Sequence, residues 1–191
     1  LGTPAAEESH KKDEQQEALG RVLLDSESTT QFRGLVARAN YMAQDRAELQ
    51  FPVKELCRWM SAPDVDAWAR LKRLVRYLVG RPRAVMKFDW QSTPEVLDVY
   101  SDANWAGCKV SRKSTSGGTL MWGKLCLRSY SKTQATIAQS SAESELIAVV
   151  RAACEGLGMI ALADDFGIEL KVRLHSDASA ALGILQRPGV G

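Results

Sequence analysis

Apolar residues recur every three or four positions between residues 28 and 79, which is the spacing of helices that bury one face. Ser28, Thr29 or Thr30 is expected to cap the first helix. Pro52 falls near the start of the second helix, where proline is best tolerated, and Pro82 stops the third. The apolar faces predicted for the three helices are Phe32, Leu35, Val36, Ala39 and Met42, then Leu49, Val53, Leu56, Cys57 and Met60, then Val65, Trp68, Leu71, Leu74, Val75 and Leu78.

From residue 84 the apolar pattern changes to the alternation that is typical of β-strands. Gly123 and Lys124 separate two of these segments by two residues, the spacing of a tight hairpin. Residues 98–131 are therefore expected to form an antiparallel meander. The predicted strands are residues 84–90, 97–101, 119–122 and 125–131.

A long helix is predicted after the meander. Glu143 completes a capping box that begins at Ser140. Gly156 and Gly158 are expected to end this helix. Beyond them the pattern predicts a short helix, a strand and a last helix, at residues 159–166, 170–176 and 178–185. Strands and helices in this order indicate a mixed α/β domain.

These patterns divide the chain into a flexible polar linker at residues 1–27, a helical segment at 28–83 and an α/β domain at 84–191. A length of 191 residues suits one domain with a smaller helical unit. Because no uninterrupted run of about 18 apolar residues occurs, no membrane span is predicted. The chain begins with neither Met nor a hydrophobic signal segment, so it is expected to be a piece of a longer protein.

Composition adds two constraints. The four cysteines are widely spaced and form no Cys-x-x-Cys pair, so we expect a reducing compartment and neither a zinc site nor a disulfide framework. The charge is uneven, because residues 33–87 carry twelve basic and five acidic side chains, a net charge of +7. Such a segment suits a polyanion such as nucleic acid, and a solvated helix surface explains it equally well.

Three acidic residues stand at comparable places in the predicted elements. Asp102 ends the first strand of the meander, Asp177 ends the later strand, and Glu145 lies in the first turns of the long helix. If the two strands are parallel neighbours, both aspartates emerge at one sheet edge, where the helix can present Glu145. Clustered carboxylates repel each other without a cation, and hard oxygen ligands suit Mg²⁺ or Mn²⁺. The pattern therefore suggests a two-ion site for phosphodiester hydrolysis.

Other interpretations of the polar residues stay open. Glu143 points to a different side of the helix from Glu145, and a capping role is sufficient to explain it. Asp98 fits an ordinary polar position on an alternating strand. His175 shares a strand face with Asp177, but a packed or hydrogen-bonded histidine is favoured over a ligand. Spacing alone does not decide between a metal site and ordinary surface carboxylates.

Five short motifs follow one another in the second half of the chain. They are YSDANWAG at residues 100–107, RKSTSGG at 112–118, SKTQ at 131–134, SSAESEL at 140–146 and HSDASAAL at 175–182. Their order and spacing resemble the ribonuclease H region of copia-type LTR retrotransposon polyproteins. Residues 32–41 and 68–80 resemble the segment that joins the reverse transcriptase to that ribonuclease H.

The resemblance implies a ribonuclease H-like fold, a mixed five-stranded sheet with flanking helices. The last helix and its fourth acidic ligand are expected to be missing, because the chain stops at Gly191. It also implies cleavage of the RNA strand of RNA–DNA hybrids with two Mg²⁺ or Mn²⁺ ions. By motif position, Asp102, Glu145 and Asp177 match the catalytic, metal-binding acids. The residues expected to contact the hybrid backbone are Arg112, Lys113, Ser114, Lys132 and Gln134.

The expected partners are an RNA–DNA hybrid and the reverse transcriptase portion of the same polyprotein, with no membrane and no small-molecule cofactor. The expected location is the cytoplasm, within a retroelement particle, or the nucleus. A non-catalytic nucleic-acid-binding remnant of such a polyprotein is the alternative. An integrase-like nuclease is a further rival, because it also uses three acids.

Overall fold

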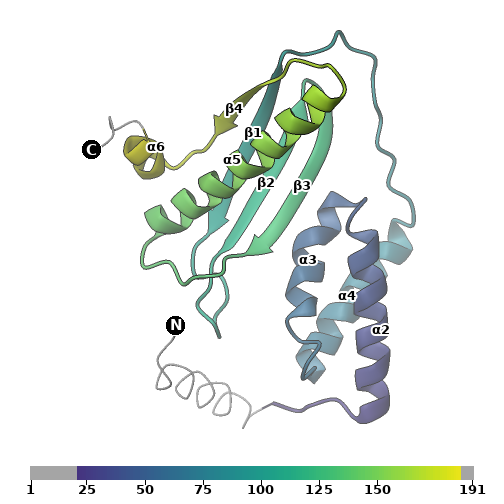
Figure 1. The fold of residues 1–191 in the computed structure, drawn as a ribbon. Helices are drawn as coiled ribbons and strands as arrows, with labels where there is room; N and C mark the ends of the chain where they lie inside the picture. Colours follow the sequence, from purple (N-terminus) through teal and green to yellow (C-terminus); the bar gives the residue numbers. More distant parts are fainter. Residues whose placement is uncertain (1–20, 186–191) are drawn as a thin grey trace. The chain divides into compact units, whose positions relative to one another are not determined.

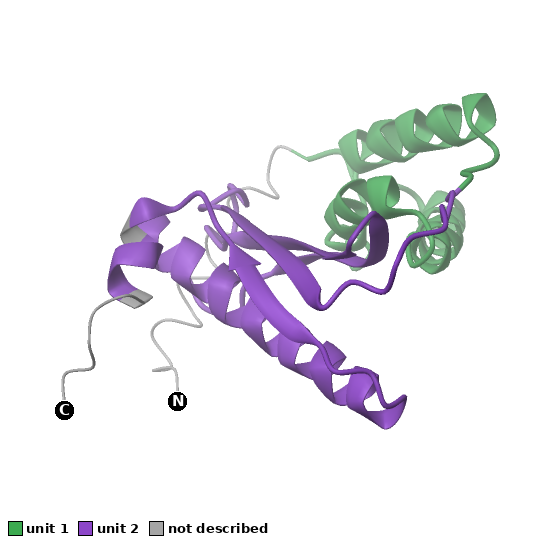
Figure 2. Cartoon of the chain, turned by 90° about the horizontal axis from the view of Figure 1, so that it is seen from above, with its two compact units in different colours: residues 1–85 green, residues 86–191 purple. Residues whose placement is uncertain are grey.

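The computed structural model describes residues 21–185, which belong to two compact units. The first unit ends at Val85 and the second begins at Met86 (Figure 2). Each unit has its own helices and its own cluster of buried apolar side chains. Most of the predicted linker, residues 1–20, lies outside the described residues.

Among the residues that the structure describes, the first unit is built from three helices: α2 (Ser26–Met42), α3 (Ala47–Cys57) and α4 (Val65–Gly80) (Figure 1). Their existence confirms the predicted helical segment, but the predicted caps of the first helix are wrong. Asp25 caps α2, its carboxylate accepting a hydrogen bond from Ser28 N at 2.8 Å. The apolar pattern misses the start of this helix, because the residues of its first turn are polar. Pro52 also lies inside α3 rather than in its first turn.

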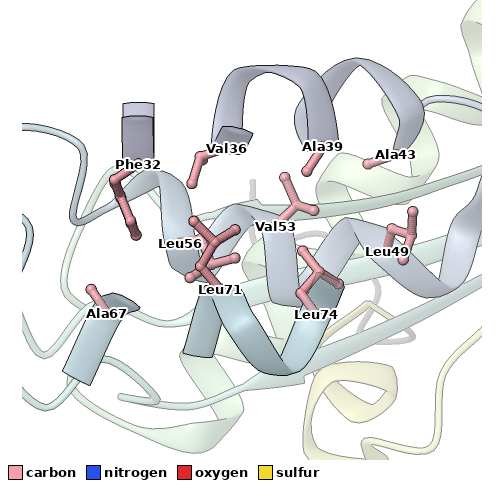
Figure 3. Close-up of a cluster of buried hydrophobic side chains, with 10 residues drawn as sticks. All are labelled: Phe32, Val36, Ala39, Ala43, Leu49, Val53, Leu56, Ala67, Leu71 and Leu74. Carbon is pink, nitrogen blue, oxygen red and sulfur yellow. The ribbon is translucent and has the colours of Figure 1, made fainter. Parts of the chain in front are cut away.

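Apolar side chains from all three helices form one buried cluster (Figure 3). Phe32 is fully buried within it. Burial of such a side chain contributes about 1.5–3 kcal/mol, so packing of the apolar faces stabilises these short helices. Four positions predicted for these faces are exposed, because each helix buries only a narrow stripe: Leu35, Met42, Val65 and Val75. The cluster comprises Phe32, Val36, Ala39, Ala43, Leu49, Val53, Leu56, Ala67, Leu71 and Leu74.

Residues 81–94 form neither helix nor strand. The strand predicted at residues 84–90 is therefore wrong, and its apolar side chains lie in solvent, with Val85 89% and Trp90 97% exposed. An alternating pattern makes a strand only where a neighbouring strand takes up its backbone hydrogen bonds. No strand within residues 21–185 pairs with this segment.

A mixed sheet forms the centre of the second unit. Its strand order is β3-β2-β1-β4, with β1 antiparallel to β2 and parallel to β4. The predicted meander is confirmed, and Gly123, with a φ of 60°, occupies the predicted hairpin turn. The described residues contain four strands, whereas the resemblance implies five. They are β1 (Val96–Asn104), β2 (Thr115–Trp122), β3 (Leu125–Thr133) and β4 (Lys171–His175).

One long helix, α5 (Ser141–Asp165), packs on the sheet, and α6 (Ser179–Leu185) follows β4 (Figure 1). The predicted helix end near Gly156 and the separate helix at residues 159–166 are wrong. Gly156 is buried, and a Cβ there would lie 3.0 Å from Val172 Cγ1. The glycine therefore allows close approach of the helix to the sheet instead of ending the helix.

By length and composition alone, α5 could cross a membrane, as no other helix within residues 21–185 could. The sequence prediction of no span rested on uninterrupted apolar runs, and Arg151 and Glu155 interrupt this one. A helix that packs on the core of a soluble protein passes the same test. This feature therefore does not by itself place the chain in a membrane.

The buried cluster of the second unit joins the sheet to α5. Leu97 and Val99 of β1 are fully buried, as are Leu120 of β2 and Ala152 of α5. Burial of these side chains fixes the helix against the first strand. The two elements that carry Asp102 and Glu145 are thus held together by packing well away from their polar ends.

Candidate metal centre

Two aspartates lie beyond the same register position of two parallel strands. β1 and β4 pair so that Tyr100 stands opposite His175. Asp102 and Asp177 each follow this pair by two residues, and both are exposed. Because parallel strands run in the same direction, this register brings both carboxylates to one edge of the sheet.

Glu145 reaches this edge from the first turns of α5. Ser140 caps the helix, and its Oγ accepts a hydrogen bond from Glu143 N at 3.1 Å. Glu145 Oε1 accepts a hydrogen bond from the backbone N–H of Ala103 at 3.2 Å. The bond therefore ties α5 to the strand residue next to Asp102.

Asp102, Glu145 and Asp177 form one group, in which one carboxylate oxygen of each lies within 4.8 Å of the others. Three carboxylates can share a pair of ions about 3.5–4 Å apart only if they lie within roughly 8 Å of one another. The group is well inside this limit. Its ligand atoms are all hard oxygens, the kind that Mg²⁺ and Mn²⁺ prefer.

The electrostatics of the group favour a bound cation. Burial raises the pKa of Glu145, and the charges of Asp102 and Asp177 raise it further, while the hydrogen bond from Ala103 acts in the opposite direction. Glu145 Oε2 is buried and has no hydrogen-bond partner among the described residues. Because a buried carboxylate oxygen without a partner is costly, these residues fit a hard divalent cation.

Glu143 and His175 lie outside this group. Glu143 Oε2 accepts a hydrogen bond from Gln139 N at 2.7 Å, so it closes the start of α5 through the residue before the cap rather than through the N–H of Ser140 itself. His175 Nε2 lies 2.7 Å from Asp98 Oδ1, and its ring stacks on Tyr100 with 4.5 Å between centroids. The predicted packed, hydrogen-bonded histidine is confirmed.

The five residues predicted to contact a nucleic-acid backbone are of two kinds. Arg112 and Lys132 are exposed and Lys113 is half-buried, so their charges are accessible. Ser114 and Gln134 are 0% and 5% exposed and form internal hydrogen bonds. Their side chains are not available to a ligand in this arrangement. Their places in the motifs therefore need another explanation.

Several residues that shape the surroundings of the group were missed at the sequence level. Trp105 Nε1 donates to Ala138 O at 3.1 Å and so holds the segment before α5. Ala106 has a φ of 48°, a left-handed conformation that costs a non-glycine residue of order 1 kcal/mol. The buried hydroxyls of Ser116 and Ser144 were also missed. Their only sequence signal is that they fall within the motifs.

The chain is similar to polyproteins of plant transposons. Over 141 residues, 74% of this chain, it is 34% and 33% identical to the retrovirus-related Pol polyproteins from transposons RE2 and RE1 of Arabidopsis thaliana, and it spans 10% of each. It is also 36% identical to secreted RxLR effector protein 161 of Plasmopara viticola over 116 residues, 61% of this chain and 81% of that protein. No protein-family model and no solved structure matches the chain.

The identity to the two Arabidopsis polyproteins extends over about three quarters of the chain. The five motifs resemble the same class of mobile element. Likeness in overall sequence and likeness in local motifs therefore lead to the same group of proteins. The chain belongs to the retrovirus-related Pol polyproteins of copia-type transposons.

Proposed function

We propose that residues 86–191 form a ribonuclease H that hydrolyses the RNA strand of RNA–DNA hybrids during reverse transcription. The observation that carries this proposal is the group of Asp102, Glu145 and Asp177, in which one carboxylate oxygen of each lies within 4.8 Å of the others. The Pol polyprotein family supplies the biological context. The mixed sheet, with α5 packed on it, fits the ribonuclease H-like fold that the motifs imply.

In the proposed mechanism, Asp102, Glu145 and Asp177 hold two Mg²⁺ or Mn²⁺ ions. Ions held by these residues would supply activation of a water molecule and stabilisation of the leaving oxygen of the phosphodiester. The family resemblance implies that cleavage leaves 3′-hydroxyl and 5′-phosphate ends. The chain contributes three carboxylates held close together, and the Ala103 N–H orients Glu145 Oε1. Because the pKa of Glu145 is raised, its deprotonation is coupled to ion binding.

The substrate is proposed to be held by its phosphates. Arg112, Lys113 and Lys132 are accessible cations on the same unit as the carboxylates, and contacts to phosphates orient a nucleic acid without selecting its sequence. The reverse transcriptase portion of the same polyprotein is the proposed partner. The proposed location is a retroelement particle in the cytoplasm, or the nucleus.

A cleavage assay with the purified chain tests this function. The substrate is an RNA–DNA hybrid labelled on its RNA strand, incubated with Mg²⁺, with Mn²⁺ or with EDTA. Cleavage should require the metal and spare duplex DNA. Glu145→Gln should lower the cleavage rate by about 100-fold or more, because it removes a ligand charge. Glu143→Gln, two residues away on the same helix, should retain the native rate.

Four outcomes would contradict the proposal. Cleavage that persists in EDTA, or that Glu145→Gln leaves unchanged, would show that these carboxylates are not the site. Binding of the hybrid without any cleavage would favour the non-catalytic remnant. Joining of DNA ends without cleavage of hybrids would favour an integrase-like nuclease.

A further inference from the structure

Four buried polar residues lie on the elements next to the carboxylate group. Ser114 precedes β2, Ser116 lies within it, Gln134 follows β3 and Ser144 lies in α5. The three serines are at most 2% exposed, and Gln134 is 5% exposed. Polar groups are costly to bury unless hydrogen bonds replace water. The hydrogen-bond partners of these four side chains therefore indicate the structural role of each residue.

Gln134 connects two of these elements. Its Nε2 donates to Ser116 Oγ at 3.0 Å and to the backbone oxygen of Ser144 at 2.8 Å. Its backbone N–H donates to the oxygen of Ser114 at 2.9 Å. One side chain thus fixes the first turn of α5 to β2. Ser144, the residue that it holds, immediately precedes Glu145.

The connection continues to the strand that carries Asp102. Ser116 of β2 pairs with Ala103 of β1, and the N–H of Ala103 donates to Glu145 Oε1. Together with the bond from Gln134 to Ser144, these contacts form a closed circuit through β2, β1 and α5. A circuit that closes on itself restrains the helix against the strand more tightly than either hydrogen bond alone.

Gln134 Oε1 is buried and has no hydrogen-bond partner among the described residues. The amide cannot turn over to pair this atom, because Oε1 would then face the oxygen of Ser144. An unpaired buried acceptor is unfavourable for stability. A glutamine at this position therefore suits a requirement for geometry better than a requirement for stability.

We propose that Gln134, through Ser116 and the backbone of Ser144, is a positioning residue that sets the place of Glu145 relative to Asp102 and so the affinity of the metal site. The inference rests on the proposed function for the identity of the ligand, a divalent cation. In this inference Gln134 supports the element that carries Glu145 and does not contact the substrate.

Isothermal titration calorimetry of the full chain with Mn²⁺ tests the inference, because it measures metal affinity without any turnover. Gln134→Met keeps the shape of the side chain and removes its hydrogen bonds. The variant should bind Mn²⁺ about 10–100-fold more weakly, the usual effect of losing a group that orients a metal ligand. Its KM for the hybrid at saturating metal should stay native, because Gln134 does not touch the substrate.

Two control variants separate positioning from other effects. Lys132→Gln changes an exposed residue of the same motif, so it should raise the KM for the hybrid and leave Mn²⁺ affinity unchanged. Leu170→Ala removes a core side chain of the same unit, 8% exposed. Leu170 immediately precedes β4, at the end of the strand opposite Asp177. This variant should lower the melting temperature yet retain native Mn²⁺ affinity.

The outcomes distinguish this inference from the proposed reaction. Native Mn²⁺ affinity in Gln134→Met overturns the positioning role. If the KM for the hybrid is raised at the same time, Gln134 acts on the substrate instead. If Leu170→Ala also loses Mn²⁺ affinity, the weaker binding of Gln134→Met is explained by lost stability, and the positioning role is overturned too. If the native chain binds Mn²⁺ but cleaves no hybrid, only the proposed reaction fails, and the affinity of Gln134→Met still decides. If the native chain binds no Mn²⁺, both fail.

Discussion

Among single residues, Asp98 links β1 to β4 most directly. Its carboxylate accepts hydrogen bonds from Arg173 Nε at 2.6 Å and Nη2 at 3.0 Å, and His175 Nε2 lies 2.7 Å from Oδ1. The pKa of Asp98 is lowered to about 2, chiefly by the hydrogen bond from Arg173 and next by the one from His175. β4 leads directly to Asp177, so this link also supports the carboxylate group.

We expect Asp98→Asn to lower the melting temperature near neutral pH. A carboxyl whose pKa is lowered by folding stabilises the protein above its unfolded pKa of 3.8 and loses this contribution as the pH falls to about 2. The difference in melting temperature between variant and native chain should therefore be full at about pH 6 and shrink between about pH 4 and pH 2. Circular dichroism at several pH values measures it.

Asp89→Asn is the matched control for this change. Asp89 is paired with Lys87 at 2.7 Å, but both side chains are more than half exposed, and exposed pairs contribute little. This variant should have a nearly native melting temperature throughout the pH range. A constant deficit in Asp98→Asn from about pH 6 to pH 2 would show that lost packing, not lost charge, is the cause.

At the scale of elements, the contact of α5 with the sheet depends on one glycine. A Cβ at Gly156 would lie 3.0 Å from Val172 and 3.4 Å from Val99, whereas a Cβ at Gly158 would meet nothing within 4 Å. The two glycines are two residues apart on one helix, so they face different surroundings. Only the first is required by packing.

We expect Gly156→Val to destabilise the second unit by about 1–3 kcal/mol, the usual cost of inserting a side chain into a packed contact. Gly158→Val should change stability by less than about 0.5 kcal/mol, because valine and glycine differ little in helix propensity and space is open there. Urea denaturation, monitored by circular dichroism, compares the free energies of unfolding of the two variants. Equal losses in both variants would mean that the close approach of α5 is not required for stability.

At the scale of the whole molecule, charge is concentrated on the helical unit. The outer side of α4 is basic, whereas its buried side is apolar. Guanidinium groups without strong ion pairs are well suited to phosphates. If a hybrid is the substrate, this surface is expected to add to its binding. The exposed basic residues of α4 are Arg70, Lys72, Arg73 and Arg76.

We expect the double change Arg73→Gln and Arg76→Gln to weaken binding of an RNA–DNA hybrid to the whole chain. The slope of log Kd against log salt concentration should fall by roughly 1.5, because each lost phosphate contact releases about 0.7–0.9 fewer counterions. Fluorescence anisotropy in EDTA at several salt concentrations measures this slope without cleavage. The double change Lys124→Gln and Lys171→Gln removes the same charge elsewhere, and an equal effect there would exclude a specific contribution of α4.

The sequence by itself determined the local elements. Helices and strands follow from apolar periodicity between neighbouring residues, so the three helices of the first unit and the meander of the second are predictable. The hairpin turn at Gly123 and the cap at Ser140 are equally local, because each depends on a few adjacent residues. The motifs also identified the three acidic residues and the Pol polyprotein family.

Only the tertiary structure decided what these elements do with one another. The segment at residues 84–90 has no strand to pair with in the part of the chain that the structure describes. Helix α5 continues through Gly156 because the sheet lies against it. The 4.8 Å grouping of the carboxylates depends on the register of β1 with β4. Ser114 and Gln134 are buried although their types and motifs suggest surface contacts. Pairing and burial join residues far apart in sequence, so no local pattern contains them.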